Sequence, residues 1–131
     1  METIFTKIIK GEIPCYKIAE DEKFIAFLDI SPIAEGHTLV VPKVQVDYIF
    51  NLDDSMLSEL VLFAKRVAKA VEKNISCLRI GVAVIGIDVP HTHIHLVPIN
   101  QVGDLDFKKK RVELSSEQMK TIAEKISASF E

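Results

Sequence analysis

The stretch HTHIHLVPI, residues 91–99, contains three of the four histidines of this chain. Successive side chains of an extended strand point to opposite faces, so a strand here places the three histidines in one row. Ile94 and Leu96 then lie on the other face, where we expect them to pack against a core. Several imidazoles buried without a purpose would leave many polar groups in need of partners. We therefore interpret His91, His93 and His95 as a functional site.

The composition predicts one folded domain over residues 1–131. A chain of this length, 48% hydrophobic and 27% charged, can bury roughly two thirds of its unfolded surface without disulfide or metal cross-links. The net charge of -3 argues against nucleic acid as a partner, because binding to a phosphate backbone needs a clustered positive surface.

The N-terminal segment lacks the apolar core of a signal peptide, because Lys7 and Lys10 interrupt it. No apolar run approaches the length of a membrane span. Cys15 and Cys77 do not have Cys-x-x-Cys spacing. We expect a cytoplasmic protein with reduced thiols and no membrane partner.

Hydrophobic periodicity and turn residues predict an α+β fold. We expect a short helix capped by Thr3, a long helix over residues 54–74 and a C-terminal helix opened by a capping box at Ser115 and Gln118. Strands are expected at residues 16–20, 23–30, 36–43, 77–85 and 91–99, the last two paired antiparallel. This order predicts one roughly five-stranded antiparallel sheet with the helices packed on one face.

Three further polar features lie outside the histidine stretch. Asp29 follows an apolar strand directly, where it either forms a turn or accepts hydrogen bonds from the hydroxyls of a ligand. His37 begins the strand GHTLVVPK and is a candidate to support the histidine row. The basic run 108–111 lies in a polar loop, and we interpret it as a solvated face, with phosphate or nucleic-acid binding as the less favoured alternative.

Residues 91–97 resemble the motif of the histidine triad superfamily, His-φ-His-φ-His-φ-φ with φ hydrophobic, from which only Thr92 departs. The strand GHTLVVPK is similar to the one that supplies this family's additional histidine. The segments IFTKIIKGEIP and FIAFLDISP resemble the opening segments of its Hint branch. The similarity extends over nearly the whole chain up to Asn100, and it implies the family's fold and a homodimer.

The resemblance implies a purine nucleotide hydrolase or transferase that acts at the α-phosphorus of AMP joined to an amine such as lysine, to an acyl group or to another phosphate. His93 would attack phosphorus in line and form a nucleotidyl-histidine, which water then hydrolyses. His95 and His91 would donate to the phosphate oxygens or to the leaving group, and His37 would orient the row. No cofactor is implied.

The resemblance also implies how the nucleotide is held. Asp29 would accept from the ribose hydroxyls, and the base would occupy an apolar slot whose residues could equally be ordinary core: Phe5, Ile8, Phe27, Ile30 and Leu39. Gly86 and Asp88 lie in the loop before the histidines, where relatives often carry Gly-Gln-Ser. An ionised Asp88 would repel a phosphate beside it, or would favour a cationic amine if it faced the leaving group.

Many Hint relatives bind a structural zinc through an N-terminal Cys-x-x-Cys and a later histidine. The corresponding positions here are Thr3, Thr6 and Gln45. Hydroxyl and amide groups are poor zinc ligands beside thiolate and imidazole, so we predict no structural zinc.

Two other functions are compatible with the sequence. His-x-His on a strand is also a common metal-ligand spacing, and a metalloprotein would be sensitive to chelators. The altered loop 86–88 suggests instead a nucleotide-binding regulatory module that has lost catalysis, which would bind AMP without turnover.

Overall fold

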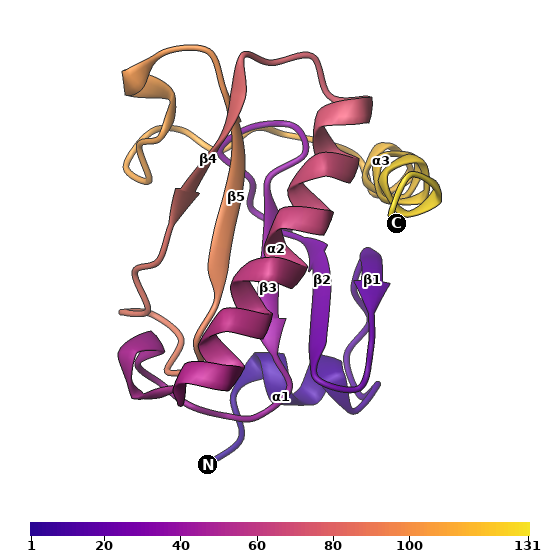
Figure 1. Ribbon diagram of the computed structural model, residues 1–131. Coiled ribbons are helices and arrows are strands. Elements are labelled where there is room, and N and C mark those ends of the chain that lie inside the picture. Colours follow the sequence, from indigo (N-terminus) through magenta and orange to yellow (C-terminus); the bar gives the residue numbers. More distant parts are fainter.

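The computed structural model describes all of residues 1–131 and confirms the predicted α+β fold (Figure 1). Five strands form one antiparallel sheet in the order β1-β2-β3-β5-β4. The strands are β1 (Lys17–Glu20), β2 (Phe24–Leu28), β3 (Thr38–Pro42), β4 (Arg79–Ala83) and β5 (Ile94–Ile99). The helices are α1 (Ile4–Ile9), α2 (Asp54–Asn74) and α3 (Ser116–Ala128), with short 3-10 turns η1 (Ile49–Asn51) and η2 (Val102–Asp104).

The helices begin where the sequence places capping residues. Thr3 accepts a hydrogen bond from a backbone N–H at the start of α1, and Asp53 does the same for α2. Ser115 and Gln118 form a reciprocal capping box at the start of α3. Each cap satisfies N–H groups that have no partner inside the helix. No helix combines the length and the apolar character needed to cross a membrane.

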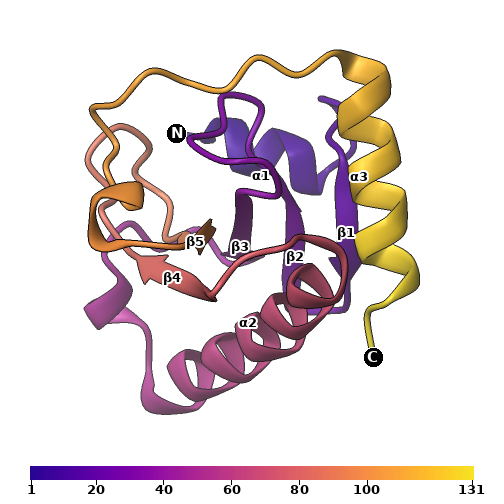
Figure 2. The ribbon, with the colours of Figure 1, turned by 90° about the horizontal axis from the view of Figure 1, so that it is seen from above.

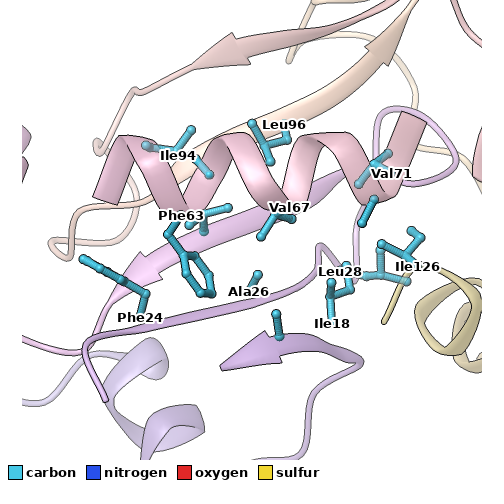
Figure 3. Packing of buried hydrophobic residues seen from close by; sticks show 14 of the residues in the cluster. Ile18, Phe24, Ala26, Leu28, Phe63, Val67, Val71, Ile94, Leu96 and Ile126 are labelled. Atoms are coloured by element: carbon cyan, nitrogen blue, oxygen red, sulfur yellow. The ribbon is translucent and has the colours of Figure 1, made fainter. Parts of the chain in front are cut away.

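The larger core lies between the sheet and α2, with α3 closing it beside β1 (Figure 3). Alternate residues of β2 and β5 point into it, among them Ala26, Ile94 and Leu96. The apolar stripe of α2 covers them with Leu60, Phe63, Val67 and Val71. Burial of this apolar surface is the main favourable contribution to folding.

The expectation that all helices pack on one face is wrong. Figure 2 shows α1 on one side of the sheet and α2 on the other. Phe5 of α1 packs edge-on against Phe27, with ring centroids 5.7 Å apart, in a second, smaller core with Ile25, Leu39 and Val41. All five residues of β2 are buried, so both faces of this strand need an apolar cover, and the short N-terminal helix supplies the second one.

Regular strand β5 begins at Ile94 and not at His91 as predicted. The backbone N–H and the hydroxyl of Thr92 both donate to the carbonyl of Val46, which lies outside the sheet. This pairing takes residues 91–93 out of the ladder. His95 is within the ladder, opposite Leu39 of β3 and Ala83 of β4.

Candidate active site

A cavity of about 410 Å³ lies on the α1 face of the sheet. His93 and His95 line it, whereas His91 and His37 do not. The lining also contains every residue that the family resemblance assigns to the nucleotide: Phe5, Ile8, Phe27, Asp29, Ile30, Leu39, Gly86 and Asp88. The fold therefore brings side chains from α1, from β2 and β3 and from the loop before β5 to one concave site.

The ring of His93 is held in one tautomer. Its Nδ1 lies 2.7 Å from the carbonyl oxygen of His91. A carbonyl can only accept, so Nδ1 carries the proton and the neutral ring keeps its lone pair on Nε2. Nε2 of His93 has no hydrogen-bond partner within the chain. Every fully buried side-chain nitrogen or oxygen has such a partner, so Nε2 of His93 is not fully buried and is accessible from the cavity. Phe5 packs edge-on against the ring of His93, with ring centroids 4.9 Å apart, and restricts its rotation.

His37 and His95 form a directional chain of hydrogen bonds. The backbone N–H of Ile33 donates to Nδ1 of His37 over 3.1 Å, which leaves the proton of the neutral ring on Nε2. Nε2 of His37 lies 3.0 Å from Nδ1 of His95 and donates to it. The proton of His95 is consequently on its own Nε2, which has no partner in the protein. The cavity thus contains a lone pair on His93 and an N–H donor on His95.

Burial keeps these supporting rings neutral. Desolvation, assisted by the neighbouring positive groups, lowers the pKa of His37 and of His95 from 6.5 to about 4. Desolvation also lowers the pKa of His91. The same effect raises the pKa of Asp29, whose Oδ2 lies 3.6 Å from Nε2 of His37. Neutral rings are what the hydrogen-bond chain requires, since a protonated His37 could not accept from Ile33.

His91 has a different position from the one that the resemblance implied. Its ring is fully buried; Nε2 donates to the carbonyl of Pro42 at 2.8 Å, and Nδ1 accepts from the hydroxyl of Thr3 at 2.9 Å. With both nitrogens engaged, the ring has no free donor for a phosphate oxygen. Its carbonyl, however, holds the tautomer of His93, so His91 acts on the site through its backbone.

Two groups of residues lie close enough together to be considered as metal sites. Asp29, His37 and His95 offer ligand atoms that all lie within 4.8 Å of one another, but the facing nitrogens of the two histidines already share a proton. Thr3, Thr6 and Gln45 are close together, and the hydroxyl of Thr6 donates to Oε1 of Gln45 at 2.6 Å. These hydroxyl and amide groups do not fit zinc, and hydrogen bonds connect them instead.

The loop after η2 contributes two residues that the sequence did not single out. Phe107 lines the cavity and packs edge-on against His95, with ring centroids 4.7 Å apart. Arg111 lines it too; the last residue of the basic run 108–111 is thus exposed to solvent, as predicted, and also reaches the cavity. No periodicity marks these positions, because they lie in an irregular segment that only the fold brings to the cavity.

Comparison with known proteins gives a consistent result. The family model described as HIT domain matches residues 10–102. The chain is 35% identical over 130 residues to adenosine 5'-monophosphoramidase hnt1 of Schizosaccharomyces pombe, with 98% of each chain covered. A solved Hit-like protein of Bartonella henselae superposes with a TM-score of 0.84 at 31% identity, covering 98% of this chain and 96% of that one. A Zn-bound histidine triad family protein of Mycobacterium smegmatis gives a TM-score of 0.84 at 26% identity, covering 98% and 93%.

Proposed function

The chain belongs to the HIT domain family, and on that premise we propose that it is a nucleotide hydrolase acting at the α-phosphorus of AMP-type conjugates. Adenosine phosphoramidates, in which AMP is joined to an amine such as lysine, are the proposed substrates, and acyl and dinucleotide conjugates share the same reacting phosphorus. The relative named adenosine 5'-monophosphoramidase supports this substrate class. One observation carries the proposal: the unprotonated Nε2 of His93 and the protonated Nε2 of His95 belong to neighbouring rings in one cavity.

The first step is attack by His93. Its Nε2 lone pair forms a bond to the α-phosphorus while the bond from phosphorus to the leaving nitrogen breaks. The leaving nitrogen takes that electron pair and a proton from solvent, so that a neutral amine departs, while the Nε2–H of His95 donates a hydrogen bond to a non-bridging phosphoryl oxygen. Asp29 accepts from the ribose hydroxyls, and the apolar lining from Phe5 to Leu39 surrounds the base.

The second step is hydrolysis of the nucleotidyl-histidine. Water attacks phosphorus, the bond from phosphorus to Nε2 of His93 breaks, and AMP leaves. The proton released by the water returns to solvent and balances the one taken up in the first step, so that His93 and His95 are back in their starting states. The Ile33 N–H and the ring of His37 keep Nδ1 of His95 as the acceptor throughout, so the donating N–H of His95 stays on the side of the cavity.

We propose in addition that residues 1–131 act as one domain and that two copies associate. Helix α3 packs on β1 and α2 although it lies outside the matched residues. Strand β4 is an edge of the sheet, and Val82 on it is exposed, as are Val84 and Ile85 directly after it. An apolar edge strand favours pairing with a second chain. Sedimentation of the wild type and of Val82→Lys tests this, and an unchanged association state in the variant argues against the β4 edge.

Release of AMP from an adenosine phosphoramidate, measured with excess EDTA, tests the function directly. The wild type is expected to turn over in EDTA, and His93→Ala is expected to lose about 10³-fold or more of kcat, because no other side chain can form the intermediate. Lys110→Ala, an exposed substitution outside the cavity, is the control.

The other outcomes identify the alternatives. Activity that requires added metal would favour a metal site at Asp29, His37 and His95. AMP binding without turnover by the wild type would indicate a regulatory module. Full activity of His93→Ala would rule out the nucleotidyl-histidine.

A further inference from the structure

The segment from Asp106 to Val112 passes along the cavity from outside the residues that match the family model. The backbone N–H of Val112 donates to the carbonyl of Pro32 at 2.8 Å and attaches the segment to the loop after β2. Phe107 packs against His95 and, with ring centroids 5.9 Å apart, against His37. The segment is therefore anchored at two points beside the hydrogen-bonded histidine pair.

Arg111 lies in this segment and is the only permanent cation in the lining, whose other charged side chains are Asp29 and Asp88. No carboxylate is within ion-pairing distance of its guanidinium, and it makes no side-chain hydrogen bond. Lysines that form ion pairs with glutamates, among them Lys10, Lys17, Lys23 and Lys43, do not belong to this lining. A planar fork of donors beside a cavity, with no partner in the protein, matches the geometry of a phosphoryl group.

We propose that Arg111 is a catalytic residue that binds the non-bridging oxygens of the reacting phosphoryl group together with Nε2 of His95. The inference rests on the proposed function and adds to it a residue from outside the family's matched domain. His95 offers one neutral donor, and the two carboxylates of the lining repel an anion. Arg111 therefore supplies the positive charge that the cavity otherwise lacks.

The charge state of the cavity also supports a phosphate-binding role for Arg111. Burial lowers the pKa of His37, His91 and His95, so these rings carry no charge near neutral pH. A phosphoryl group entering the cavity would then meet the neutral ring of His95 and two acids. The guanidinium offsets that repulsion, and it does so through a segment that Phe107 and Val112 hold in place.

The experiment compares the binding of AMP and of adenosine, by titration calorimetry, to the wild type, Arg111→Ala, Arg111→Lys and Lys110→Ala. Adenosine has the same base and ribose without the phosphate. Loss of a charge-assisted hydrogen bond predicts AMP binding about 10- to 100-fold weaker in Arg111→Ala, with adenosine unchanged. Arg111→Lys should lie between, since lysine keeps the charge and loses the fork. Lys110→Ala removes the same charge from a neighbouring exposed position and should bind AMP like the wild type.

Three results overturn the inference: unchanged AMP binding in Arg111→Ala, an equal loss in Lys110→Ala, or an equal loss for AMP and adenosine. The first result would show that Arg111 does not contact the phosphate. The second would show that only the general positive charge of the surface matters, and the third would show that Arg111 has a structural role. These results differ from failure of the proposed function, which would be seen as an absence of phosphoramidate turnover by the wild type. Loss of kcat/KM in Arg111→Ala by a similar factor completes the case for a catalytic residue.

Discussion

The two faces of the central sheet are built from the same strands and differ in almost everything else. On the α2 face, Ile94 and Leu96 of β5 enter a core of 18 buried apolar residues. On the α1 face, the intervening His95 and the preceding His93 line a cavity beside a core of five residues. One strand with a period of two thus supplies a face that packs into the core and a face that presents histidines to a cavity.

The difference shows how this fold tolerates buried imidazoles. Every buried histidine has a hydrogen-bond partner: Pro42 and Thr3 for His91, the carbonyl of His91 for His93, and each other for His37 and His95. An unpaired buried polar group costs free energy, and these partners avoid that cost. The larger core lies on the α2 face, and on the α1 face two ring nitrogens, Nε2 of His93 and of His95, have no partner in the protein.

Substitution of adjacent residues of β5 gives the strongest test of this difference between the two faces. Leu96→Ala should lower the free energy of unfolding by about 2–5 kcal/mol, because it leaves a cavity in the α2-face core. His95→Gln should instead lower kcat by about 10²-fold or more at little cost in stability, because it removes the ring N–H positioned to donate to the reacting phosphoryl group. Urea denaturation and single-turnover kinetics measure the two effects. Large stability losses in both variants would mean that the faces are not separate.

A change of pH tests the buried histidine pair. The pKa of His37 and of His95 is about 4 in the folded protein and 6.5 when unfolded, so between these values the unfolded chain binds more protons. Their stabilising effect is present above pH 6.5 and decreases as the pH falls toward 4. At pH 5 we expect a loss of about 2 kcal/mol per ring relative to pH 7.

Urea denaturation at both pH values checks this, with His37→Gln as the comparison. Gln keeps a donor toward His95 and removes one titrating ring, so the difference between pH 7 and pH 5 should shrink by roughly half. An unchanged difference would place the pH dependence elsewhere in the molecule.

A smaller effect is expected from the hydroxyl of Thr3, which joins α1 to the histidines. Thr3→Val removes the donor to Nδ1 of His91 and should lower kcat up to about ten-fold with little change in KM, because the carbonyl that orients His93 is held less firmly. Thr3→Ser keeps the hydroxyl and should restore kcat. Equal rates for the Val and wild-type proteins, or failure of Ser to rescue, would show that α1 only packs against the site.

The smallest change tests Asp88, which lines the cavity from the loop before β5. Asp88→Ser should lower the preference for a cationic over a neutral amine leaving group by a factor of about 3–10, because one exposed carboxylate is largely screened by water. Rates for lysine and uncharged alkylamine conjugates of AMP measure the ratio. An equal effect on both conjugates would exclude a role in choosing the leaving group.

Local physical chemistry in the sequence was enough to predict much of this molecule. The caps at Thr3 and Ser115 mark helix starts that the structure confirms. The alternation of His93, Ile94, His95 and Leu96 assigned side chains to opposite faces of one strand. These features depend on neighbouring residues only, so the sequence by itself determined the helices and strands and which side chains of the histidine strand share a face.

Only the tertiary structure decided which histidine does what. His91 and His95 are the same residue type at equal spacing from His93, yet one is held between Thr3 and Pro42 and the other contacts His37 and the cavity. The sequence equally did not predict that α1 covers the second face of the sheet, or that Phe107 and Arg111 line the cavity. Each depends on segments far apart in the chain, whose packing is decided by burial and hydrogen-bond partners that no local pattern encodes.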